Sequence, residues 1–126
     1  MSCVLDASAV LALINDEPGG TLVRDRLAGS VMSTVNAIEV GSKLVDKGLP
    51  PGRAWEALDL LGIAFVDLDF SLAATVVELR GRTRDRGLSL ADGVCLALAI
   101  REGLPALTAD RAWSTLDLPC PVELIR

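Results

Sequence analysis

Four acidic residues, Asp6, Glu39, Asp92 and Asp110, lie far apart in the sequence, but each is next to a predicted change from strand to helix. Asp6 and Asp110 closely follow short apolar stretches, whereas Glu39 and Asp92 lie in the first turns of predicted helices. A carboxylate in such a position commonly caps a helix by accepting hydrogen bonds from free backbone N–H groups. Capping is the simplest interpretation of each acid taken singly. Four carboxylates gathered at one place would instead suit a hard divalent cation such as Mg²⁺ or Mn²⁺.

Two of these acids have a capping partner at the expected spacing. Asn36 lies three residues before Glu39, and Ser89 lies three residues before Asp92. Both pairs match the arrangement of a capping box, in which two side chains satisfy each other's backbone N–H groups. The sequence therefore predicts helices that begin after Asn36 and after Ser89.

Other residue types narrow the chemistry further. The chain has no histidine and no tyrosine, so histidine-dependent triads and histidine-ligated zinc are excluded. The three cysteines form no CxxC pair and lie within apolar stretches, which indicates small core residues of a reducing compartment. Ser8 and Thr108 are close in sequence to Asp6 and Asp110, where their hydroxyls can add hydrogen bonds to a carboxylate site. Carboxylates and hydroxyls are thus the candidate functional groups.

Alternating apolar segments predict the elements that carry these residues. Runs of strand length occur near residues 3–5, 31–34, 63–66, 106–108 and 122–125, and segments with helical spacing of apolar residues separate them. This alternation predicts an α/β fold with a mainly parallel sheet in a single domain, residues 1–126. Because the carboxyl ends of parallel strands meet at one edge of the sheet, we expect the four acids to gather there.

The charge of the chain opposes simple binding to nucleic acid. Twelve basic and seventeen acidic residues give a net charge of −5. The candidate phosphate-binding patch is a run of four arginines shortly before Asp92, namely Arg80, Arg82, Arg84 and Arg86. On a helix, Arg80 and Arg84 would share one face, and Arg82 and Arg86 a neighbouring one. A solvated helix end with ordinary surface arginines explains the run equally well, so both interpretations stay open.

Four segments in this order resemble the PIN-domain family, and more narrowly the VapC-type toxins of bacterial toxin–antitoxin pairs. They are residues 4–10 (VLDASAV), 35–39 (VNAIE), 88–99 (LSLADGVCLALA) and 107–113 (LTADRAW). The resemblance implies a five-stranded parallel sheet in the order 3-2-1-4-5, flanked by helices. It also implies a Mg²⁺- or Mn²⁺-dependent endoribonuclease, usually a homodimer, that acts on RNA and is held inactive by a VapB-type antitoxin.

The resemblance also assigns roles to residues. The metal-binding and catalytic acids fall on Asp6, Glu39, Asp92 and Asp110, with polar support from Ser8 and Thr108. Metal-activated water would then hydrolyse the phosphodiester bond and leave a 5′-phosphate. Gly93 departs from the pattern, because such toxins often carry a larger, sometimes basic, residue there. We expect a cytoplasmic protein, since no signal peptide or membrane-length apolar run is visible.

Three alternative functions fit parts of the sequence. A receiver domain is also a small α/β domain with an acidic Mg²⁺ site, but it needs a lysine after its last strand, and the last lysine here is Lys47. Residues 65–69 (FVDLD) resemble the aspartate motif of haloacid-dehalogenase-type phosphatases, yet we interpret Asp67 and Asp69 as a polar strand end. A catalytically silent binding protein on the PIN fold stays open.

Overall fold

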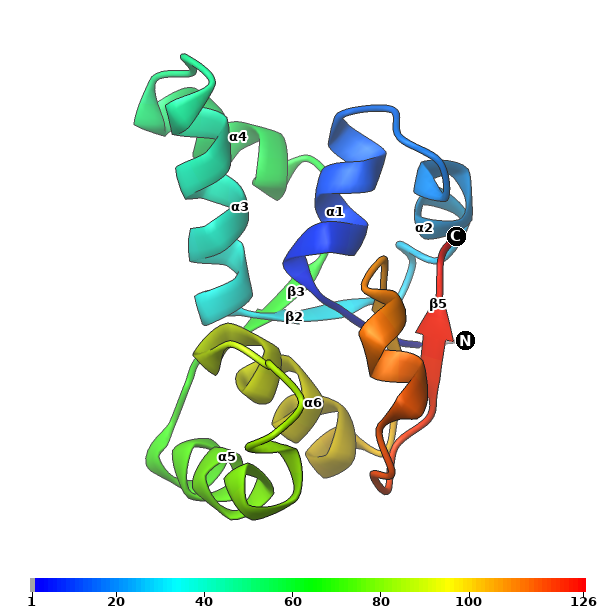
Figure 1. Ribbon diagram of the computed structural model, residues 1–126. Coiled ribbons are helices and arrows are strands. Elements are labelled where there is room, and N and C mark those ends of the chain that lie inside the picture. Colours follow the sequence, from blue (N-terminus) through cyan, green and yellow to red (C-terminus); the bar gives the residue numbers. More distant parts are fainter. Residues whose placement is uncertain (1) are drawn as a thin grey trace.

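The computed structural model of the protein describes residues 2–126, in which short strands alternate with helices (Figure 1). In chain order the elements are β1 (Val4–Leu5), α1 (Ala7–Ile14), α2 (Gly20–Asp25), β2 (Val31–Ser33), α3 (Thr34–Asp46), α4 (Pro51–Asp59), β3 (Ala64–Val66), α5 (Phe70–Thr83), α6 (Leu90–Glu102), β4 (Ala106–Thr108), the 3₁₀-helix η1 (Arg111–Thr115) and β5 (Val122–Leu124). Among residues 2–126, no helix is long and apolar enough to cross a membrane.

The five strands form one sheet in the order β3-β2-β1-β4-β5, and every neighbouring pair is parallel. This confirms the predicted fold class and strand order. The direction of winding reverses between β1 and β4, and in open α/β sheets such a switch point is where ligands bind. A receiver domain has the order 2-1-3-4-5, so the receiver hypothesis is wrong.

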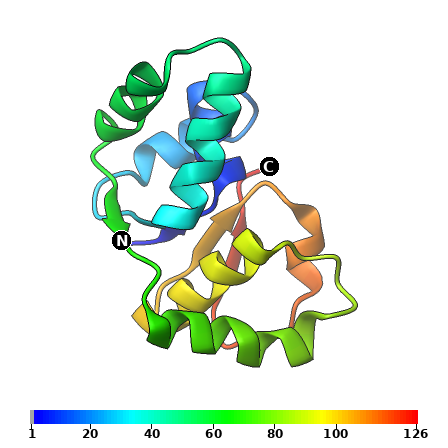
Figure 2. The ribbon, with the colours of Figure 1, turned by 90° about the vertical axis from the view of Figure 1, so that its left-hand side faces the viewer.

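Helices cover both faces of the sheet (Figures 1 and 2). Successive strand residues point to opposite faces, so Leu5 and Leu107 enter the core beneath α1, α3 and α4. Val4 and Ala106 enter the second core, which contains α6 and the fully buried Trp113. The two central strands, β1 and β4, are therefore covered by an apolar core on each face of the sheet, as parallel sheets require.

The sequence interpretation missed α2, because the segment before it reads as a turn and the helix has only six residues. The start of α2 packs directly on α1. A Cβ atom at Gly20 would lie 2.6 Å from the carbonyl oxygen of Ala12, so only glycine permits this approach. A contact of this kind depends on tertiary structure and leaves no periodic signal in the sequence.

Candidate active site

The switch point of the sheet positions the first and last of the four acids. Asp6 directly follows β1, and Asp110 comes two residues after β4, so both lie at the carboxyl edge of adjacent central strands. Glu39 lies on α3, which begins immediately after β2. Asp92 lies in the first turn of α6, whose N-terminal end faces the N-terminal end of α3 (Figures 1 and 2).

Asp6 is the most constrained of these carboxylates. It is the N-cap of α1, and its Oδ1 accepts hydrogen bonds from the backbone N–H of Ala9 at 2.8 Å and from Ser8 Oγ at 2.7 Å. Its Oδ2 accepts a hydrogen bond from Thr108 Oγ1. The residue is only 4% exposed, and this burial raises the pKa of Asp6 to about 6 although the three hydrogen bonds act to lower it. A buried, poorly solvated carboxylate of this kind would gain from a bound cation.

The two hydroxyls next to Asp6 join β1 to the loop after β4. Ser8 Oγ accepts a hydrogen bond from the backbone N–H of Ala109 at 2.9 Å, and Thr108 Oγ1 accepts one from the N–H of Asp110 at 3.0 Å. The two hydroxyl oxygens are 3.3 Å apart. They therefore fix the backbone of Asp110 relative to the carboxylate of Asp6.

The predicted capping box at Asn36 and Glu39 is wrong. The N-cap of α3 is Ser33, whose Oγ accepts a hydrogen bond from the backbone N–H of Asn36 at 3.0 Å. The helix starts three residues earlier than predicted because β2 ends at Ser33 and the chain turns there without a loop. Asn36 Nδ2 instead donates to Glu39 Oε1 at 3.1 Å.

The predicted capping box at Ser89 and Asp92 is confirmed. Ser89 Oγ accepts from the backbone N–H of Asp92 at 3.1 Å, and Asp92 Oδ2 accepts from the N–H of Ser89 at 3.0 Å. Asp110 likewise caps η1, because its Oδ1 accepts from the N–H of Ala112 at 3.0 Å. Each of these two carboxylates uses one oxygen for capping, and the other accepts no hydrogen bond from residues 2–126.

The charges of three of the four acids affect the pKa of the same residue, Cys95. Cys95 is fully buried one helical turn after Asp92, and burial raises the pKa of its thiol. The negative charges of Asp6, Asp92 and Glu39 each raise this pKa further, and the charge of Asp92 also raises that of Asp6. These three carboxylates therefore share one electrostatic environment around Cys95.

The acids do not form a closed ligand set in this structure. Within the described part of the chain, no three Asp, Glu or Cys side chains are arranged so that they could hold a metal ion. The donor chemistry nevertheless fits a hard cation, because the set consists of carboxylates around a buried Asp6 and contains no nitrogen ligand. The carboxylate oxygens of Asp92 and Asp110 that are not used for capping are the ones available to an ion.

The four arginines are all exposed. The helix α5 ends at Thr83 with Arg84 as its C-cap, so Arg86 lies beyond the helix and the predicted helical relation of Arg86 to Arg82 is wrong. Arg82 and Arg86 line a polar hollow together with Asp117.

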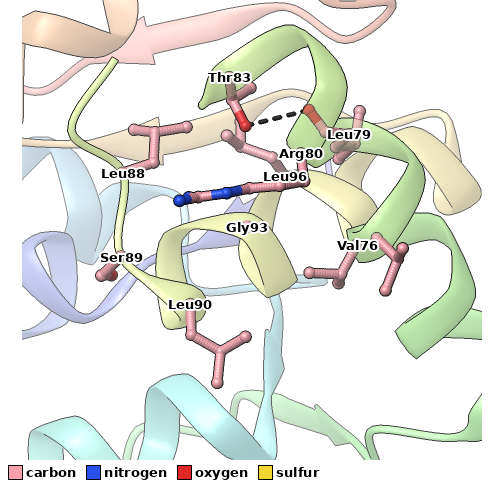
Figure 3. Close-up of a pocket in the computed structure, with 10 residues that line it drawn as sticks. Val76, Leu79, Arg80, Thr83, Leu88, Ser89, Leu90, Gly93 and Leu96 are labelled. Carbon is pink, nitrogen blue, oxygen red and sulfur yellow. Dashed lines mark hydrogen bonds between the residues drawn. The ribbon is translucent and has the colours of Figure 1, made fainter. Parts of the chain in front are cut away.

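Arg80 lines a different pocket, a mainly apolar one between α5 and α6, where its guanidinium extends toward Leu88 and Ser89 (Figure 3). Gly93 forms part of the pocket wall, and a Cβ atom there would lie 3.3 Å from Val76 Cγ1. Glycine at this position therefore lets α5 and α6 pack closely beside the Asp92 cap. Arg80 is the member of the run that shares a pocket with Ser89, the capping partner of Asp92.

The phosphatase-like motif has a structural role. Asp69 is the N-cap of α5, where it accepts from the backbone N–H of Leu72 at 2.7 Å, and it also pairs with Arg101 at 3.0 Å. Capping by the Leu72 N–H and the nearby Arg101 hold the pKa of Asp69 below its usual value. This position agrees with a polar strand end leading into a helix.

Comparison with known proteins gives a consistent set of similarities. The PIN-domain family model matches residues 3–118. Over 124 residues the chain is 32% identical to a protein of Mycolicibacterium smegmatis named Ribonuclease VapC, covering 91% of this chain and 96% of that protein.

Solved structures of low sequence identity share the fold. The chain resembles the crystal structure of VapBC2 from Rickettsia felis bound to a promoter DNA fragment, with TM-score 0.75, 18% identity and 98% of each chain covered. It also resembles DNA-bound VapBC from Salmonella typhimurium, with TM-score 0.77, 16% identity, and 100% of this chain and 99% of that chain covered.

Proposed function

Because this chain belongs to the PIN-domain family, we propose that it is a Mg²⁺- or Mn²⁺-dependent endoribonuclease and the toxin of a VapBC-type toxin–antitoxin pair. The observation that carries this proposal is the buried carboxylate of Asp6 at the switch point of the sheet, which accepts hydrogen bonds from Ser8 and Thr108. The relative named Ribonuclease VapC, with 32% identity over nearly its whole length, supports the same activity.

In this proposal, Asp6, Glu39, Asp92 and Asp110 hold the ion. A divalent cation, when bound, lowers the pKa of water and neutralises charge on the phosphate. Ser8 and Thr108 orient the Asp6 carboxylate, and Thr108 also fixes the backbone that carries Asp110. With water as the nucleophile, hydrolysis would need neither the ribose 2′-hydroxyl nor imidazole acid–base chemistry, which suits a chain that contains no histidine.

Arg80 is the strongest candidate for a phosphate contact among the four arginines. Its guanidinium lies in the pocket that includes Ser89, next to the proposed metal-binding edge, and no carboxylate lines that pocket. Arg82 and Arg86 share their hollow with Asp117, whose charge offsets part of their attraction for RNA. We propose that Arg80 holds an RNA phosphate bound next to the scissile bond.

We propose a VapB-type antitoxin as partner and a homodimer in the cytoplasm. Between α3 and α4 runs an apolar groove bordered by Ile38 and Trp55, which are 62% and 55% exposed, and by Val45. A groove of this kind can take the apolar face of a partner helix. The exposed side chains of Val77 and Leu90 support contact with a second copy.

A catalytically silent binding protein on the same fold is the second candidate. The observation in its favour is that Asp6, Asp92 and Asp110 cap helices, and that no three acids of residues 2–126 are arranged so that they could hold one ion. An assay of RNA cleavage distinguishes the ribonuclease from the catalytically silent binding protein.

The test uses purified protein, RNA and either Mg²⁺, Mn²⁺ or a chelator. Cleavage that requires metal, leaves 5′-phosphate ends and is lost in Asp6→Asn is the expected result. An Asp69→Asn variant, whose carboxylate caps α5 away from the proposed site, is the matched control and should cleave normally. Metal-independent cleavage, or none with the wild-type chain under conditions where it is folded, would remove the proposed mechanism.

A further inference from the structure

Asn36 is a fully buried polar residue on the first turn of α3, and it belongs neither to the proposed metal ligands nor to the arginine run. Its side-chain amide makes three hydrogen bonds to three different parts of the fold. Oδ1 accepts from Ser33 Oγ at 2.5 Å, while Nδ2 donates to Glu39 Oε1 at 3.1 Å and to the carbonyl oxygen of Ala91 at 3.3 Å. Its amide thus contacts the end of β2, one proposed metal-binding acid and the first turn of α6.

The partners define how the amide is oriented. A carbonyl oxygen can only accept a hydrogen bond, so the group facing Ala91 must be the NH₂ of Asn36. Ser33 Oγ already accepts the backbone N–H of Asn36, which leaves its own proton free for Asn36 Oδ1. Both N–H donors of the amide are therefore committed, one to the Glu39 carboxylate and one to α6.

The contact on α6 is one residue away from Asp92. Ala91 and Asp92 are consecutive in the first turn of this helix, and Asp92 is fixed there by its capping box. An amide that holds Glu39 with one N–H and Ala91 with the other therefore sets the spacing between two acids that come from different helices. Buried hydrogen bonds of this kind usually keep one arrangement, because an unpaired partner in the interior is costly.

We propose that Asn36 is a positioning residue of the metal site, orienting the Glu39 carboxylate and fixing α3 against α6 so that Glu39 and Asp92 face the same ion. The inference rests on the proposed function, because it assigns Glu39 and Asp92 to that ion. Residues that orient metal ligands in this way typically change metal affinity by about 10- to 100-fold when they are replaced. Asn36 does not touch RNA or the ion itself.

A purely structural role makes a different prediction, and Ser33 provides the matched control. Ser33→Ala removes the N-cap of α3 and the hydrogen bond to Asn36 Oδ1, but it leaves both N–H contacts of Asn36 in place. Asn36→Ala removes these two contacts and leaves the Ser33 cap. Both variants should melt at a lower temperature, so melting alone does not separate the roles.

The experiment is a calorimetric titration of metal-free protein with Mn²⁺, using wild type, Asn36→Ala and Ser33→Ala. We expect Asn36→Ala to raise the Kd by about 10-fold or more and Ser33→Ala to change it less than about twofold. If Asn36→Ala does not fold, Asn36→Ser, which keeps one hydroxyl donor, replaces it with an expected smaller increase above twofold. A Kd for the folded Asn36 variant within twofold of wild type would overturn the inference. Wild-type protein that binds no Mn²⁺ would instead refute the proposed metal site.

Discussion

Replacing Asp6 by asparagine should change how the stability of the metal-free protein depends on pH. Burial raises the folded-state pKa of Asp6 from 3.8 to about 6, so the folded protein binds this proton more tightly than the unfolded chain does. The free energy of unfolding therefore falls as pH rises from about 4 to about 6 and stays reduced above that range. The side chain of the Asp6→Asn variant carries no charge at any of these pH values, so this loss should be absent from the variant.

The size of this change in unfolding free energy follows from the pKa shift of Asp6. A difference of about two pKa units, at about 1.4 kcal/mol each, corresponds to about 3 kcal/mol. Part of this difference is already present at pH 4, because the unfolded carboxyl is partly ionised there, so the unfolding free energy of Asp6→Asn minus that of wild type should increase by about 2.4 kcal/mol between pH 4 and pH 7.

Urea unfolding in the presence of a chelator, followed by circular dichroism at several pH values, measures this difference directly. Asp69→Asn serves as a control, because the pKa of Asp69 is shifted in the opposite direction to that of Asp6. The pKa of Asp69 is lowered, so its contribution is present above the unfolded pKa and is lost only as pH falls below it, outside the measured window. Parallel pH profiles for wild type and Asp6→Asn would refute the claim that Asp6 is a buried, destabilising charge.

Further predictions concern metal, catalysis, RNA and the partner. Mg²⁺ or Mn²⁺ should raise the melting temperature in proportion to the logarithm of its concentration above Kd, and a flat response would exclude the site. Amide variants of the other acids should lose cleavage but only about 1 kcal/mol or less of stability, as unfolding and RNA assays would measure, namely Glu39→Gln, Asp92→Asn and Asp110→Asn. Arg80→Gln should reduce the log–log salt slope of RNA binding by roughly 0.7–0.9, whereas Arg84→Gln, outside both pockets, should leave it unchanged. Expression of the chain alone should stop growth, and coexpression of its upstream neighbour should restore it; normal growth with abundant folded protein would exclude the toxin hypothesis.

The sequence by itself determined the elements and the edge on which the acids lie. Short apolar runs and helical spacings of apolar residues are local signals, and they located all five strands and every α-helix except the short α2. Helix caps are equally local, so Asp6 and the Ser89–Asp92 pair were found correctly. The strand order came from the resemblance to PIN domains, and the sheet agrees with it.

Only the tertiary structure decided which polar groups meet. Asn36 is within three residues of Glu39, but its second donor reaches Ala91, which is 55 positions away in sequence. Asp6 and Thr108 are separated by 102 positions, so the burial that raises the pKa of Asp6 exists only when β1 and β4 pair. The arginine run is continuous in sequence, yet Arg80 lines one hollow whereas Arg82 and Arg86 line another. Spacing along the chain fixes which residues share an element, whereas hydrogen bonding and desolvation depend on distances between elements, which only packing sets.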